Sequence, residues 1–140
     1  MSARLAVTVG VAALAVAFAA PLAAQAPAYE IVGDGIPKPL TSTPGSAARG
    51  KALLAKREAA HCLKCHSIGQ KDLAGGGTTG PSLDGIGANL TAAQLRLSVV
   101  DLSRVNRGTE MPGFHKRGGE APKLTAQEVE DVVAFLRTLR

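Results

Sequence analysis

The sequence predicts an all-α domain of three or four helices joined by long loops. Helix-start signals at Thr91 and Thr125 are each followed by apolar residues at helical spacing. Segments rich in glycine and proline separate these stretches, and no strand-like run of β-branched residues surrounds the two cysteines. The 140 residues include only one tyrosine, three phenylalanines and no tryptophan. Helices so poor in bulky side chains need another source of buried apolar surface.

Length and charge limit the possible functions. A chain of 140 residues is expected to form one domain, which excludes a large enzyme. Much of the 46% hydrophobic content lies near the amino terminus, so a membrane protein with several spans is excluded, and two cysteines are too few for a disulfide-rich scaffold. Sixteen basic residues are interspersed with 11 acidic ones, giving a net charge of +5. Because the basic residues are not accompanied by aromatic side chains on which bases could stack, we expect no nucleic-acid partner.

Residues 1–28 have the pattern of a secretory signal peptide. Arg4 precedes an apolar stretch over residues 5–20, and Pro21 then introduces small residues suited to cleavage between positions 24 and 28. The apolar stretch is shorter than the roughly 20 residues that a membrane-spanning helix needs. We therefore expect export and no stable membrane insertion after cleavage, with a retained membrane anchor as the alternative.

Residues 29–45 are predicted to form an extended arm, because the three prolines in this segment remove donors and disfavour a helix. Residues 49–60 follow and consist mainly of helix formers. The residues available to the inner face of this first helix are Ala52, Leu53, Ala59 and Ala60. Gly50, near the start, indicates either fraying of the helix end or the close approach of another helix.

The only cysteines are Cys62 and Cys65, and His66 follows them directly. A disulfide across two intervening residues closes too small a loop to stabilise an exported protein much. A dithiol redox motif needs a βαβ context, and a zinc site would need His61 or His115 as a fourth ligand. The spacing C-x-x-C-H is that of covalent haem attachment. The sequence therefore predicts one haem c, with dithiol redox chemistry and zinc binding as the alternatives.

Haem attachment through this motif suits the geometry of one helical turn. Cys62 and Cys65 lie three residues apart, so their thiols can reach the two vinyl groups along one haem edge. His66, immediately after them, is then carried under the iron as its proximal ligand. The haem also supplies the buried apolar mass that the composition lacks.

The sixth iron position requires a donor from later in the chain. Met111 is the only methionine after the first residue, and a thioether opposite His66 is typical of electron transfer because it raises the reduction potential. A gap-filling core role for Met111 is the alternative, and His115 is the competing ligand. We interpret His61 as a surface histidine. An iron with both axial positions filled has no place for a substrate, so we expect no catalytic residue at this haem.

Two irregular segments connect the helices. Residues 67–80 are rich in glycine and are predicted to form a loop, and residues 75–77 lack the flanking strand and helix of a nucleotide-binding loop. A turn over residues 80–85 follows, with Leu83 as its apolar anchor. Residues 103–119 form the second irregular stretch, which carries the candidate sixth ligand.

Two capping boxes mark the remaining helices. Thr91 and Gln94 open a helix that runs to about residue 101, and Thr125 and Glu128 open the last helix. The apolar residues at helical spacing are Leu95 and Val99 in the first of these helices, and Val129, Val132, Val133, Phe135, Leu136 and Leu139 in the second. We expect the second set to form core and to pack against the helix at 49–60.

In these features the chain resembles the class I cytochromes c. Besides the attachment motif, the resemblance rests on Gly50, Gly80, Pro81, Met111 and Phe135. It implies that the first and last helices cross at the glycine and the aromatic residue, and that the carbonyl group of Pro81 orients the His66 ring. The implied fold is three to four helices and long loops around one covalently bound haem.

Within this class the chain is similar to SoxX, the family of small subunits of the SoxAX complexes in bacterial thiosulfate oxidation. The similar stretches are residues 36–41, 80–87, 94–101, 111–114 and 124–136, together with Asn106. The segment between Phe114 and Leu124 is shorter than in many SoxX chains. This departure affects the local surface near the sixth ligand.

The SoxX resemblance implies a periplasmic electron-transfer subunit. In SoxAX, an L-cysteine S-thiosulfotransferase, the SoxA partner joins thiosulfate to a cysteine of the carrier SoxYZ. SoxX accepts the electrons on its own haem and passes them to a soluble cytochrome c. Haem attachment leaves this chain no free cysteine as a nucleophile, so catalytic residues are expected on the partner. An independent periplasmic cytochrome c shuttle, which would share every haem residue, is the alternative.

Overall fold

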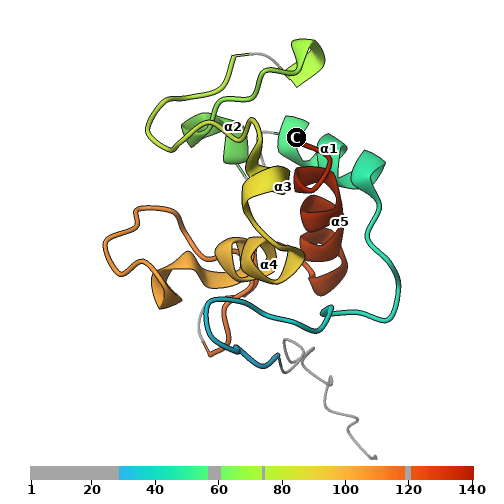
Figure 1. Cartoon of the computed structure of the whole chain (residues 1–140), viewed down its shortest axis with the longest axis vertical. Helices are drawn as coiled ribbons and strands as arrows, with labels where there is room; N and C mark the ends of the chain where they lie inside the picture. Colours follow the sequence, from blue (N-terminus) through green and yellow to red (C-terminus); the bar gives the residue numbers. More distant parts are fainter. Residues whose placement is uncertain (1–28, 57–60, 74, 119–120) are drawn as a thin grey trace, which may run out of the picture.

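Three longer helices and two single-turn helices make up the α-helical part of the described residues (Figure 1). The computed structural model describes residues 29–56, 61–73, 75–118 and 121–140. The α-helices are α1 (Ala47–Ala55), α2 (Cys62–Cys65), α3 (Ile86–Asn89), α4 (Ala92–Asp101) and α5 (Ala126–Leu136), and 3-10 turns span Lys71–Leu73 and Leu102–Arg104. The all-α prediction is confirmed. Five α-helices are described, against the three or four predicted. The additional helices are short, since α2 and α3 are each only one turn long.

The predicted signal peptide, residues 1–28, lies outside the described residues. Ala59 and Ala60, two residues that we expected on the inner face of the first helix, also lie outside them. No helix in the described part of the chain is long and apolar enough to cross a membrane.

Both predicted capping boxes are present. The backbone N–H of Thr91 donates to the side chain of Gln94 at 2.9 Å, and the N–H of Gln94 donates to the Thr91 hydroxyl at 3.3 Å. Thr125 and Glu128 make the same pair of bonds at 2.8 and 3.2 Å at the start of α5. These bonds satisfy backbone donors that have no partner within the helix, and they fix where α4 and α5 begin.

Helix α1 is shorter than predicted, and its inner face differs from the prediction. The helix begins after Ser46, whose side chain accepts from the Arg49 N–H, and it ends at Ala55 rather than at residue 60. Leu53 and Leu54 are buried, whereas Ala52 is exposed, so the assignment of Ala52 to the inner face was wrong. A contact face contains positions three and four apart, so a face centred on Leu53 and Leu54 leaves Ala52 outside it.

Gly50 marks the point where α1 crosses α5. A Cβ atom at Gly50 would overlap the carbonyl oxygen of Asp131 and would lie 2.9 Å from the Cβ of Phe135. The absence of a side chain therefore lets the two helix backbones approach directly. Of the two interpretations of this glycine, close helix approach is confirmed, and the contact includes the predicted aromatic residue.

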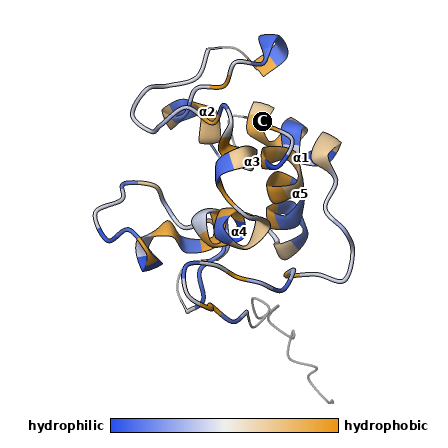
Figure 2. Cartoon of the chain, viewed as in Figure 1, coloured by the Kyte–Doolittle hydropathy of each residue, from blue (hydrophilic) through white to orange (hydrophobic). Residues whose placement is uncertain are grey.

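The core lies between α1, α4 and α5. Every residue of the predicted apolar set on the last helix is buried, and Leu139, which follows the helix, is buried with them. Helix α5 packs mainly against α1 and also against α4, as we expected for the first and last helices. Figure 2 shows hydrophobic residues gathered on α5 and on the neighbouring parts of α1.

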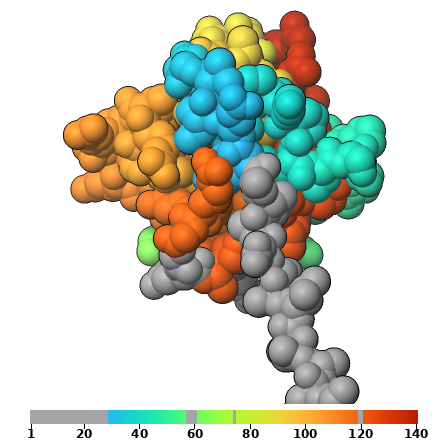
Figure 3. Space-filling model, turned by 90° about the horizontal axis from the view of Figure 1, so that it is seen from below, coloured from blue at the N-terminus to red at the C-terminus, as the bar shows by residue number. Residues whose placement is uncertain are grey.

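Residues 29–45 contain no helix, and they are attached to the surface of α4 and α5. The Ile36 side chain is fully buried, and its N–H donates to the Ala93 carbonyl at 3.0 Å. The side chain of Arg96 donates to the Ile36 carbonyl at 2.6 Å, and the Leu40 N–H donates to Glu130 at 2.8 Å. Figure 3 shows the first part of this arm, in blue, across the centre of one face. The arm is thus an integral part of the fold.

Helix α3 was not predicted. It follows Gly85, whose φ of 73° lies in the left-handed region that favours glycine. The Gly87 N–H donates to the Leu139 carbonyl at 2.8 Å, which connects α3 to the carboxyl-terminal end of the chain. The predicted turn around Leu83 therefore continues into a helical turn that rests on the end of α5.

Candidate haem-binding site

Helix α2 places the three residues of the attachment motif on one turn. Cys62 and Cys65 are its first and last residues, and His66 caps its carboxyl end by donating its N–H to the Cys62 carbonyl at 2.9 Å. Neither cysteine forms a disulfide. Burial raises the pKa of the Cys62 thiol to about 11, so this thiol is protonated at neutral pH. The arrangement leaves both thiols available for thioether formation.

The His66 ring is held by the turn that contains Pro81. The Nδ1 atom of His66 lies 2.7 Å from the Pro81 carbonyl oxygen. A carbonyl oxygen only accepts hydrogen bonds, so Nδ1 is the donor and Nε2 is the nitrogen left for a metal. A histidine with this tautomer and a carbonyl partner on its other nitrogen is arranged as metal-binding histidines commonly are. The contact is the one that the cytochrome resemblance implied.

His66 and Met111 line the same small apolar cavity, which has a volume of about 40 Å³. Its walls come from α1, α2, α4, α5 and the connecting loops, through Leu54, Cys62, His66, Leu83, Val99, Met111, Phe114, Leu124, Val132 and Leu136. The lining surface is apolar, and Cys62, His66 and Met111 are among the residues that form it. This donor set fits a haem with covalent attachment and two axial ligands. Sequence analysis did not predict the contributions of Leu54 and Leu124, because they depend on how distant helices meet.

The segment that carries Met111 is held along α4 by backbone hydrogen bonds. The Phe114 N–H donates to the Val99 carbonyl at 3.1 Å, and the Leu124 N–H donates to the Phe114 carbonyl at 3.0 Å. The Met111 N–H donates to the Thr109 hydroxyl at 3.1 Å, and its side chain packs partly buried against the core. These bonds position the loop so that its methionine faces the cavity.

The other two histidines of the chain, His61 and His115, do not line this cavity. His115 is buried, but it does not line the cavity, and its Nδ1 lies 2.7 Å from the Leu124 carbonyl oxygen. His61 is exposed, as predicted, and its backbone has a φ of 50°, in the left-handed region. Within the described residues, no three side chains of the types His, Cys, Asp or Glu are grouped as metal ligands. The geometry therefore gives no support to a zinc site.

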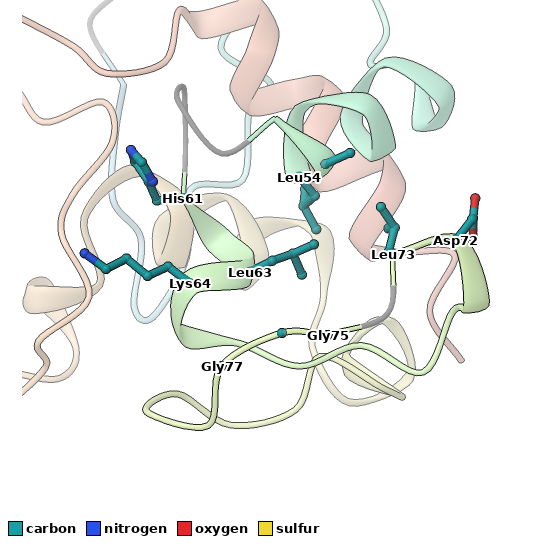
Figure 4. A pocket seen from close by; sticks show the side chains of 10 residues that line it. Leu54, His61, Leu63, Lys64, Asp72, Leu73, Gly75 and Gly77 are labelled. Atoms are coloured by element: carbon teal, nitrogen blue, oxygen red, sulfur yellow. The ribbon is translucent and has the colours of Figure 1, made fainter.

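A larger pocket of about 650 Å³ lies beside α2, and it shares Leu54 with this cavity. Figure 4 shows Leu54, Leu63 and Leu73 directed toward one another in this pocket, with His61 and Lys64 on the other side of α2. None of Cys62, His66 and Met111 lines it. Cys62, His66 and Met111 all line the smaller cavity instead.

Two adjacent acids on α5 organise the scaffold behind the cavity. Glu130 accepts two hydrogen bonds from Arg96 of α4, at 2.7 and 3.0 Å, and both side chains are buried. Asp131 accepts from Arg49 of α1 at 2.7 and 2.8 Å. The hydrogen bond from Arg49 is the main cause that lowers the pKa of Asp131. Sequence analysis missed this pair of ion pairs, although two acids within an apolar stripe are a recognisable signal of buried pairing.

Comparison with known proteins shows the family to which the chain belongs. The family model for cytochrome c matches residues 47–140. The chain belongs to the cytochrome c family. The cytochrome accordingly carries haem c as its cofactor and acts as an electron-transfer protein.

Solved structures give a narrower likeness. The cytochrome is similar to a chain in the crystal structure of SoxXA from P. pantotrophus, with 37% sequence identity and a TM-score of 0.73, over 79% of this chain and 93% of that chain. The predicted resemblance to SoxX is thereby confirmed. It is also similar to the c-type cytochrome SorU from Sinorhizobium meliloti, with 24% identity and a TM-score of 0.47, over 66% of this chain and 88% of that chain. No curated protein matches the sequence.

Proposed function

We propose that this cytochrome is the electron-transfer subunit of a periplasmic SoxAX L-cysteine S-thiosulfotransferase. The observation that carries the proposal is the similarity to a SoxXA chain at 37% identity over 93% of that chain. The site adds a chemical argument. Both cysteines of the chain belong to the haem attachment motif, so the subunit has no thiol left for sulfur transfer. Its contribution is therefore to move electrons, and the bond-forming residues belong to a SoxA-like partner.

Each residue of the site has a specific part in holding the cofactor. Cys62 and Cys65 would hold the haem through thioether bonds, and Nε2 of His66 would be an iron ligand. Met111, which lines the same cavity as His66, would supply the second iron ligand from the loop beside α4. The Pro81 carbonyl accepts the Nδ1 proton of His66, which fixes the tautomer and makes Nε2 a better donor. When bound, the haem supplies reversible one-electron chemistry.

The reaction on the partner defines what this subunit must accept. Joining a cysteine thiol of SoxYZ to thiosulfate forms one S–S bond, and it releases one proton and two electrons. A subunit with a single haem accepts these electrons one at a time. It must therefore pass each electron to a soluble cytochrome c before it takes the next. Cleavage removes Arg4, so 15 basic and 11 acidic residues leave a net charge of +4, which would favour an acidic surface on that acceptor in a salt-dependent way.

The fold also bears on where the signal peptide is removed. Tyr29, the first described residue, is buried, with 6% of its surface exposed, and the Arg117 guanidinium lies 4.4 Å from its ring centre. Cleavage between residues 24 and 28 keeps this contact in the mature protein. Amino-terminal sequencing of the protein from the periplasm should give a first residue between 25 and 29, and a start beyond Tyr29 would contradict this assignment.

Co-purification tests the partner. The chain would be tagged at its carboxyl end, purified from the periplasm of its native host grown on thiosulfate, and stained for haem on a denaturing gel. We expect a second, larger haem protein in stoichiometric amount. The same preparation from cells grown without thiosulfate is the control for adventitious binding. A single haem band from this chain at low salt would contradict the proposal and would favour an independent shuttle.

A further inference from the structure

The backbone of Gly80 lies against the face of the His66 ring. A Cβ atom at Gly80 would lie 2.5 Å from Cε1, 2.7 Å from Nδ1 and 3.0 Å from Nε2 of that ring. Three ring atoms at such short distances from one point mean that this point is above the ring face, and not at its edge. No side chain, however small, fits between this backbone and the imidazole.

The reason for a glycine at this position is steric and not conformational. Gly80 is not among the glycines with positive φ, so its backbone is in a region that an alanine also adopts. This distinguishes it from Gly85, where φ is 73°. At Gly80 the only obstacle to a methyl group that lies within 3.0 Å is the ring of His66.

The segment around Gly80 is firmly attached to the chain that follows α2. Four hydrogen bonds of 2.7–2.9 Å join the two segments: Gly80 N–H to Cys65 O, His66 Nδ1 to Pro81 O, Leu83 N–H to Ser67 O, and Gly69 N–H to Asp84 Oδ1. The Ser82 hydroxyl also donates to Asp84, at 2.9 Å. A backbone held in this way is a rigid surface for the ring to rest on.

A hydrogen bond to Nδ1 and a contact on the ring face restrict different motions. The Pro81 carbonyl fixes one atom at the edge of the imidazole, and the ring could still tilt about that point. Contact between Gly80 and the ring face removes this tilt. We propose that Gly80 is a positioning residue that sets the plane of the His66 imidazole relative to the haem. This inference rests on the proposed ligation of the iron by His66.

The test compares Gly80→Ala with Gly108→Ala. A Cβ at Gly108 would have no neighbour closer than 3.8 Å, and its backbone is likewise outside the positive-φ region, so this control adds a methyl group without a clash. The readouts are the g values of the ferric protein by electron paramagnetic resonance and the haem-methyl proton shifts by NMR, because both depend on the plane of the axial imidazole. Gly80→Ala should shift both, and Gly108→Ala should reproduce the wild type.

A third variant separates ring positioning from general disruption of the loop. A Cβ at Gly77 would overlap the Lys64 carbonyl oxygen and would lie 3.1 Å from the Cys65 Cα, with no ring atom among these nearest neighbours. Gly77→Ala should therefore lower the thermal midpoint while its folded fraction keeps wild-type g values. Equal g values in Gly80→Ala, Gly108→Ala and wild type would overturn the role of Gly80.

Two further observations keep the outcome clear. If Gly80→Ala does not assemble with haem, an NMR contact between the Gly80 Hα and the His66 ring protons in the ferrous wild-type protein decides the matter, and its absence overturns the proposal. If the wild-type protein itself lacks the spectrum of histidine and methionine ligation, the proposed function fails at its ligands. A normal wild-type spectrum with an unresponsive Gly80→Ala variant refutes only the positioning role.

Discussion

The crossing of α1 and α5 is stabilised differently from the two loops that follow His66 and carry Met111. At the crossing, Gly50 lets the backbones touch, apolar side chains interdigitate, and Arg49 pairs with Asp131. Among the described residues of the loops at 67–80 and 103–118, few side chains are buried, and backbone hydrogen bonds to α2 and α4 hold these loops. The crossing is therefore packed by buried side chains, whereas the loops are held mainly through their backbones, and we expect them to depend more on bound haem.

Removing the haem attachment gives the largest expected effect. In Cys62→Ser/Cys65→Ser no thioether can form, so haem staining on a denaturing gel should be lost completely. Hydrogen exchange should then show the loops at 67–80 and 103–118 open, with α1 and α5 protected the longest. The single variant Cys65→Ser, which keeps one thiol, is the control and should retain some covalent haem. Equal protection of loops and crossing in the double variant would show that the two regions are not distinct.

A change at Glu130 breaks the scaffold and leaves the ligands in place. Glu130→Ala leaves Arg96 buried without a counter-ion and removes the acceptor for the Leu40 N–H. Breaking a buried pair from one side costs about 3–5 kcal/mol of the free energy of unfolding. Denaturant titration should show this loss, and proteolysis should cut within the arm at 29–45. Glu130→Gln also removes the counter-ion of Arg96 but keeps an acceptor for the Leu40 N–H, so its arm should be cut less than in Glu130→Ala, and equal cutting in both variants would contradict the role of the arm contact.

The acid dependence of stability gives the smallest effect. Because the hydrogen bond from Arg49 lowers the pKa of Asp131 in the folded state, this carboxylate stabilises the protein above its ordinary pKa of about 3.9. The contribution is lost as the pH falls through the lower folded value. Arg49 is half-exposed, so Asp131→Asn should lower the free energy of unfolding at neutral pH by roughly 1 kcal/mol. The gap between variant and wild type should close in acid, and a gap independent of pH would contradict this assignment.

Whether a feature depends on a local pattern or on contacts between distant segments explains what the sequence could predict. Capping boxes, the apolar stripe on α5, the glycine at the crossing and the attachment motif are local patterns, and the structure places them as expected. The exposed Ala52, the helical turn α3 and the pairing of Arg96 with Glu130 depend on contacts between segments far apart in the sequence. Spacing alone could not identify Leu54 or Leu124 as cavity walls, nor the ring contact of Gly80. These features become visible only when the loops and helices are assembled.

The most direct test of the central claim is the spectrum of Met111→Leu beside that of His115→Gln. Ferric cytochromes with a sulfur–iron bond have a weak red charge-transfer band, and a methionine ligand raises the reduction potential. We expect Met111→Leu to lose the band and to lower the potential on the order of 0.1 V, a fraction of the ~0.8 V range that axial ligands set. His115→Gln, outside the cavity, should keep both. A band that persists in Met111→Leu would contradict the assignment of the axial ligands.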